Sequence, residues 1–188
     1  MISETLRAFE DIHTHVSGNP KAVCSLPPKE AIEMCRSNSN QPYSIMLHPW
    51  YIDQELIEEF VEAVKFCKDD PNFIAIGECG LDSNCETPAE LQQEGFIEAL
   101  TTAKKLHKPV IVHIVKAWDR LFQLVDQYGD VENAPVIIHG YRKNVQMAQQ
   151  LVARGYYLSL GQKYNVDVPK MIAKDRLFHE TDSINGVF

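Results

Sequence analysis

Short apolar runs alternate with longer amphipathic segments along most of this chain. In the longer segments apolar residues recur at steps of three and four, as Leu56, Phe60 and Val64 do, which is the period of a helix with one buried face. This pattern predicts helices over residues 29–36, 53–68, 88–107, 117–128, 144–154 and 169–173. The short runs predict strands over residues 8–13, 43–47, 73–76, 110–112, 136–138, 156–160 and 177–180.

The regular alternation of strands and helices favours an α/β fold. The runs 110–112 and 136–138 are apolar at every position, as expected for strands of a parallel sheet that is covered on both faces. An open doubly wound sheet and a closed barrel both satisfy this order. The 188 residues contain no linker and no low-complexity stretch, so we expect one domain spanning residues 1–188.

Composition narrows the class of protein. With 26 acidic and 18 basic residues the net charge is −8, which argues against a globally basic nucleic-acid binder but not against a local basic patch. The five cysteines include no Cys-x-x-Cys pair, which disfavours a disulfide framework or a thiolate zinc site. No signal peptide is recognisable, and no apolar run approaches the roughly 18 residues of a membrane span. We therefore expect a soluble, cytoplasmic monomer with no membrane or protein partner.

Imidazoles and carboxylates stand at the ends of the predicted strands. His13 and His15, two positions apart, point to the same face of their strand. Later strands end at or near His48, Glu78, His113, His139 and Asp182. Because the carboxyl ends of parallel strands lie on one side of a sheet or barrel, these side chains are expected to converge there.

Such a set of side chains has the chemistry of a metal site. Imidazole and carboxylate ligands suit zinc, manganese, iron or nickel better than calcium. Without His48 the set offers four imidazoles and two carboxylates, which is more than one tetrahedral ion needs. Two ions sharing a bridging carboxylate would use all of them. Paired ions roughly 3.5–4 Å apart commonly hydrolyse phosphate esters or amides, because they activate a shared water and stabilise developing charge.

Each residue taken singly has a simpler interpretation. A lone histidine after an apolar strand is more often hydrogen-bonded than metal-bound, Glu78 could be an ion-pair partner, and Asp182 could cap a helix. Trp50 and Trp118 are expected to be packing residues rather than substrate platforms. The occurrence of such groups at every strand end favours a shared site, of which His48 is the weakest member.

Several of these residues stand in strings that resemble the TatD-type metal-dependent deoxyribonucleases. In order they are His13-Thr14-His15 after an Asp, Leu47-His48-Pro49, Ile76-Gly77-Glu78-Cys79-Gly80-Leu81-Asp82, Pro109-Val110-Ile111-Val112-His113, Ile138-His139, Ser159 with Gly161, and Glu180-Thr181-Asp182-Ser183. Order and rough spacing agree over essentially the whole chain. The Gly-Glu-x-Gly-Leu-Asp and Glu-Thr-Asp-Ser strings are the most specific.

The resemblance implies a TIM-type (β/α) barrel of the amidohydrolase-like superfamily. It also implies two divalent ions (Zn, Mg or Mn) and hydrolysis of DNA phosphodiester bonds, commonly from a 3′ end. By position, one ion would be held by His13, His15 and Asp182 and the other by His113 and His139, with Glu78 as the bridge. Asp182 would also accept the proton of the bridging water, so that Asp182 and Glu78 would be the catalytic residues. His48 would contact substrate phosphate.

The chain departs from the usual family pattern in several places. Ser83-Asn84 replace an aromatic pair, Val115 occupies a position where arginine is common, and Gly140-Tyr141 replace Cys-Phe. The segment between His15 and His48 is short, and the sequence ends six residues after Asp182. We therefore expect a shortened or incomplete barrel, below the usual minimum of about 200 residues.

Two other functions remain open. A hydrolase of a small amide, lactone or phosphomonoester could use the same dinuclear site, because the fold and the ligands do not distinguish these substrates. A non-enzymatic, metal-stabilised binding protein is disfavoured by the complete ligand set. For a DNA substrate, Lys116 and Arg142 are the candidate substrate-binding cations, and with Lys143 they follow strand ends and should face the mouth. Lys104, Lys105 and Lys108 precede a strand and should lie at the opposite pole.

Overall fold

Eight parallel strands in sequential order form the framework of the structure, a computed structural model that describes residues 5–182. The strands are β1 (Asp11–Thr14), β2 (Ala22–Leu26), β3 (Tyr43–Leu47), β4 (Phe73–Asp82), β5 (Val110–Val115), β6 (Val136–Ile138), β7 (Tyr157–Leu160) and β8 (Leu177–His179). The helices are α2 (Pro28–Arg36), α3 (Gln54–Cys67), α4 (Ala89–Leu106), α5 (Trp118–Tyr128), α6 (Val145–Ala153) and α7 (Val168–Met171), with a 3-10 turn over Lys174–Arg176.

The sheet curls until its two edge strands meet, which gives a nearly closed barrel. The backbone N–H of Asp182, just after β8, donates a hydrogen bond of 3.1 Å to the carbonyl of His13 in β1. The Thr181 hydroxyl donates to Asp11 Oδ2 at 2.6 Å, and the Thr181 N–H donates to Asp11 Oδ1 at 3.2 Å. These bonds bring the ends of β1 and β8 to the same rim.

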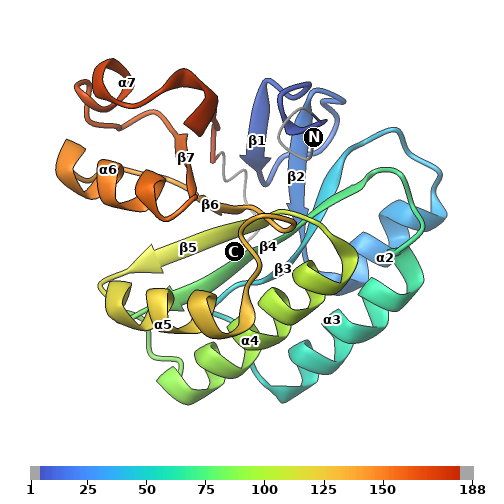
Figure 1. Cartoon of the computed structure of the whole chain (residues 1–188). Coiled ribbons are helices and arrows are strands. Elements are labelled where there is room, and N and C mark those ends of the chain that lie inside the picture. The colour runs from blue at the N-terminus through green and yellow to red at the C-terminus, as the bar shows by residue number, and fades with distance from the viewer. Residues whose placement is uncertain (1–4, 183–188) are drawn as a thin grey trace.

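Helices cover the outer face of the strands, with α2, α3, α4 and α5 following one another around the sheet (Figure 1). Their apolar faces form one large buried core with the strands, in which Phe60 of α3 and Phe96 of α4 are fully buried. Asp53 caps α3, since its carboxylate accepts from the Leu56 N–H at 2.8 Å. A second cluster joins Ile12, Ile137 and Phe178 from β1, β6 and β8, as a curled sheet requires.

The predicted α/β barrel is confirmed, and most predicted elements agree with the observed bounds to within two residues. Two differences affect the site. The strand β2 was missed, and it follows β1 after residues 15–21 without an intervening helix, so the helical layer is shortened while all eight strands are present. The strand predicted over residues 73–76 extends to Asp82. Within residues 5–182 no helix combines the length and apolar character needed to cross a bilayer.

Candidate metal centre

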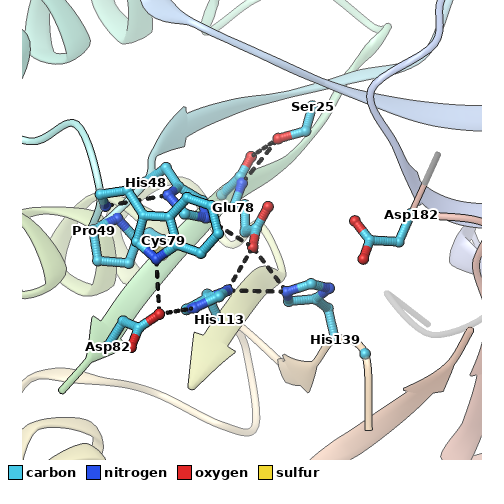
Figure 2. Close-up of polar contacts among 12 residues, drawn as sticks. Ser25, His48, Pro49, Glu78, Cys79, Asp82, His113, His139 and Asp182 are labelled. Atoms are coloured by element: carbon cyan, nitrogen blue, oxygen red, sulfur yellow. Dashed lines mark hydrogen bonds and ion pairs between the residues drawn. The ribbon is translucent and has the colours of Figure 1, made fainter. Parts of the chain in front are cut away.

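Glu78 lies at an irregularity in β4. At this point β4 contains one extra residue relative to its neighbour β3. It also contains one extra residue relative to β5, because Gly77 and Cys79 pair with two consecutive residues of β5 and leave Glu78 unpaired. A bulge of this kind re-aims a side chain out of the regular alternation of its strand. Ser25 of β2 supports it, because its hydroxyl accepts from the Glu78 N–H at 3.0 Å and donates to the Gly77 carbonyl at 3.2 Å (Figure 2).

Two glycines allow β5 to pack against this irregular segment. A Cβ on Gly77, whose φ is +118°, would lie 2.3 Å from the Ile111 carbonyl oxygen. A Cβ on Gly80, at φ +143°, would lie 2.0 Å from the His113 carbonyl oxygen. Only glycine fits both the backbone conformation and the space, so these residues fix the position of Glu78 relative to β5.

One oxygen of the Glu78 carboxylate faces the histidines of β1. Glu78 Oε2 lies 3.2 Å from His13 Nε2 and 3.4 Å from His15 Nε2. Asp182 approaches the same pair, with Oδ1 3.7 Å from His13 Nε2 and 3.9 Å from His15 Nε2. Figure 2 shows Asp182 on the opposite side of the cluster with its carboxylate turned toward Glu78.

The other oxygen faces a second set of histidines. Glu78 Oε1 lies 2.8 Å from His139 Nε2, 2.9 Å from His113 Nδ1 and 3.2 Å from His48 Nε2. His113 and His139 follow the buried runs of β5 and β6 and reach Glu78 side by side (Figure 2). His48, expected near the mouth, is therefore in direct contact with Glu78. In this cluster the six sequence-predicted ligands and His48 are all brought together.

The cluster holds the Glu78 carboxylate ionised. Burial alone would raise the pKa of Glu78, but the charge of His139 and the hydrogen bond from His113 outweigh it and hold that pKa well below the ordinary glutamate value. Burial would lower the pKa of His139, yet Glu78 and Glu180 outweigh it and raise that pKa well above its usual value. Burial lowers the pKa of His48, which keeps this imidazole neutral and able to act as a ligand.

Two further carboxylates contact the outer nitrogens of the histidines. Asp82 Oδ2 lies 3.0 Å from His113 Nε2, and Glu180 Oε1 lies 3.5 Å from His139 Nδ1. Metal-bound histidines commonly direct their second ring nitrogen at such a carboxylate, which fixes the tautomer and the ring orientation. Asp82 and Glu180 stand within the motif strings of the sequence but were assigned no role from it, because a supporting carboxylate has no spacing signature of its own.

The buried nitrogens fit a cation better than a cation-free site. A neutral imidazole carries one N–H, so His113 can donate to Asp82 or to Glu78 but not to both. His13 is 0% exposed, and within residues 5–182 neither of its ring nitrogens makes a hydrogen bond of good geometry, although Nε2 is 3.2 Å from Glu78 Oε2. Imidazole lone pairs that point at an ionised carboxylate at these distances match the arrangement in which one divalent ion binds both groups.

A cavity of about 360 Å³ opens beside the cluster, and its lining includes His113, His139, Asp182, Arg142 and Lys143. A neighbouring cavity of about 940 Å³ is lined by Asp82, Lys116 and Arg120, among others. Of the two candidate substrate-binding cations, Arg142 therefore borders the cavity at the cluster, and Lys116 borders the next one. At the opposite end of β4 and β5, Lys108 donates a hydrogen bond to the Phe73 carbonyl, as its position before a strand predicts.

The two tryptophans, both expected to be packing residues, differ in their environments. Trp118 does pack against Phe122, with ring centroids 6.4 Å apart. Trp50 is 48% exposed, and its indole N–H donates to Asp82 Oδ2 at 2.7 Å. Both side chains line the 360 Å³ cavity.

Comparison with known proteins shows one consistent family. The family model described as TatD related DNase matches residues 11–183. A protein of Cronobacter turicensis named 3′-5′ ssDNA/RNA exonuclease TatD is 34% identical over 137 residues, which is 67% of this chain and 51% of that protein. A Bacillus subtilis protein named uncharacterized metal-dependent hydrolase YabD is 29% identical over 136 residues, covering 68% of this chain and 53% of that protein. The chain thus spans about half the length of these curated relatives.

A solved structure has the same fold. The TatD homologue YJJV of Escherichia coli superimposes with a TM-score of 0.77 at 22% identity, covering 99% of this chain and 83% of that one. A TatD-family hydrolase of Entamoeba histolytica gives a TM-score of 0.73 at 19% identity, over 93% and 73% of the two chains. At these identities the likeness concerns the fold.

Proposed function

The chain belongs to the TatD-related DNase family, and from that premise we propose that it is a metal-dependent hydrolase that cleaves nucleic-acid phosphodiester bonds, with single-stranded DNA as substrate. Curated relatives are named as 3′-5′ exonucleases of single-stranded DNA and RNA. We infer the same direction here, so that cleavage starts at a 3′ end.

The observation that carries this proposal is the division of ligands between the two oxygens of Glu78. Oε2 faces His13 and His15, whereas Oε1 faces His113 and His139, all within 3.4 Å. A carboxylate with histidine pairs on opposite oxygens is suited to bridging two ions. Asp182 completes the Oε2 side, and His48 is available on the Oε1 side to bind either an ion or a substrate phosphate.

The donor set of four imidazoles and two carboxylates fits zinc or manganese, and magnesium with more water ligands. When bound, two such ions would supply a water of lowered pKa and would stabilise the negative charge that grows on the phosphate oxygens. The residues of this chain would hold and orient these groups. Asp82 and Glu180, each ionised, would fix the rings of His113 and His139 from behind.

Asp182 is the residue we assign as proton acceptor. Its side chain is 25% exposed, whereas Glu78 is 3% exposed, so Asp182 is the carboxylate with access to the cavity and to solvent. It also lines the 360 Å³ cavity in which a substrate phosphate would lie. A proton taken from the attacking water by Asp182 could therefore pass to bulk solvent.

Basic side chains at the mouth support a polyanionic substrate despite the net charge of −8. Arg142 and Lys143 line the cavity at the cluster, and Lys116 and Arg120 line the neighbouring cavity. A single strand could lie across both cavities with its phosphates near these cations.

A direct test uses 5′-labelled single-stranded DNA with added Mn²⁺ or Mg²⁺. The wild type should shorten the strand stepwise from its 3′ end and should be inhibited by EDTA. Glu78→Gln, which keeps the shape of the side chain but weakens both ion sites, should reduce the rate at least 100-fold (~3 kcal/mol or more). Glu62→Gln, an exposed glutamate of α3, is the matched control and should retain the wild-type rate.

If Glu78→Gln shortens DNA at the wild-type rate, Glu78 is not part of the catalytic site. A wild type that binds two ions by elemental analysis but leaves DNA intact would overturn the nuclease proposal in favour of a small-molecule substrate.

A further inference from the structure

Both tryptophans of the chain line the cavity that opens onto the metal centre. Trp50 comes from the turn after β3, and Trp118 is the first residue of α5. The same cavity is lined by His113, His139 and Asp182 of the cluster. Any group that reaches the cluster through this cavity therefore passes indole side chains from two separate elements.

Trp50 is held in place at the rim. Its N–H is bound to Asp82 at 2.7 Å, and its ring meets those of His48 and His113 edge-on, at centroid distances of 5.0 and 6.0 Å and interplanar angles of 83° and 77°. With these contacts the indole is still 48% exposed. A large apolar ring that is fixed in orientation and half-exposed beside a polar centre is characteristic of a ligand contact rather than of core packing.

Trp118 lies where the two cavities adjoin. It lines both the 360 Å³ cavity and the 940 Å³ cavity, which also contains Lys116 and Arg120. One side of its ring is supported by Phe122. An apolar surface at this junction, with cations on either side, suits a ligand that combines flat aromatic rings with phosphates.

We propose that Trp50 and Trp118 form a nucleobase subsite, in which the unpaired base of the terminal nucleotide stacks while its phosphate reaches the cluster beside Arg142. This inference rests on the proposed nuclease function and adds which part of the substrate is recognised. Stacking on an aromatic ring tolerates every base, because each has a π face. A paired base within a duplex cannot enter, so the subsite favours single-stranded ends.

The test compares two oligonucleotides that differ only in whether the last 3′ nucleotide carries thymine or an abasic tetrahydrofuran. The wild type should cleave the thymine substrate with a kcat/KM about tenfold higher, the value expected for one stacked base. This ratio should fall toward one in Trp50→Leu and in Trp118→Leu. A wild-type ratio of one, or a ratio that both leucine variants retain, overturns the subsite.

Two variants serve as controls. Trp50→Phe keeps an aromatic face but loses the N–H to Asp82, so a retained ratio attributes the effect to stacking rather than to Asp82 and His113. Phe66→Leu removes an aromatic side chain that is 50% exposed on α3, away from the cavity lining, and should leave the ratio unchanged.

A second readout does not depend on cleavage. Because both tryptophans line the cavity, titration with dTMP in the presence of Ca²⁺ should quench the intrinsic tryptophan fluorescence, and deoxyribose 5-phosphate should not. Quenching without DNA cleavage would support the subsite while the nuclease proposal fails. Absence of quenching by dTMP would overturn the subsite even if DNA is cleaved.

Discussion

His113 illustrates how one residue can be prepared for a cation. Its two ring nitrogens lie 2.9 Å from Glu78 and 3.0 Å from Asp82, and Asp82 is held in turn by the Trp50 indole N–H. Burial alone would raise the pKa of Asp82, but the hydrogen bonds from Trp50, Asn84 and His113 outweigh it and lower that pKa. When an ion is bound, an ionised Asp82 would favour the tautomer with the proton on Nε2, so that the Nδ1 lone pair could bind the ion beside Glu78.

The first prediction concerns this outer carboxylate. Asp82→Asn should weaken the ion on the Oε1 side of Glu78 by about 10- to 100-fold, because the amide is a weaker acceptor for His113 Nε2–H. The ion on the Oε2 side should keep its affinity, since His13 and His15 face Glu78 Oε2 whereas Asp82 contacts His113. Calorimetric titration with Mn²⁺ resolves the two steps, and Asp69→Asn, on the exposed turn after α3, is the control. Equal weakening of both steps would show that Asp82 does not act through His113.

Part of this residue-level detail was accessible from the sequence. The convergence of His13, Glu78, His113 and His139 followed from apolar periodicity, because each stands at or just after a buried apolar run, although β4 and β5 continue beyond Glu78 and His113. The exposure of Trp50 did not follow, since its ring is fixed by Asp82, which lies 32 residues away. The contact of His48 with Glu78 depends on how tightly the barrel curls, which periodicity does not encode.

At the scale of elements, β4 brings Glu78 into the centre of the cluster because the strand is irregular. The sequence predicted its end at Ile76, where the apolar run stops before Gly77 and Gly80. The structure uses these glycines to let the β5 backbone approach a bulged strand. β2 was missed although four of its five residues are apolar. It follows β1 without a helix between them, so the alternation of strands and helices along the sequence does not mark it.

The second prediction tests the close approach at β4. Gly80→Ala should lower the free energy of unfolding by about 3 kcal/mol or more, because it combines a disfavoured φ with a clash against the His113 carbonyl. Gly18→Ala is the matched control, since its φ of +101° is also unfavourable but nothing lies within 4 Å of the added Cβ, so about 1 kcal/mol is expected. Urea denaturation measures both. A Gly80→Ala loss no larger than that of Gly18→Ala would contradict the described packing.

At the scale of the whole molecule, the barrel brings distant segments to one carboxylate. Glu78 from the middle of the chain meets His13 near one end and Asp182 near the other, and the β1–β8 hydrogen bonds hold those two ends together. The shortened helical layer leaves this arrangement intact, because the ligands depend on the strands and not on a helix between β1 and β2. We infer that the barrel presents Glu78 as a bridge between two ion sites.

Anomalous diffraction from crystals grown with Mn²⁺ is the decisive test of this bridging role. We predict two peaks roughly 3.5–4 Å apart, one at Glu78 Oε1 with His113 and His139, and one at Oε2 with His13, His15 and Asp182. A single peak, or a second peak without contact to Glu78, would contradict the assignment of Glu78 as the bridging ligand.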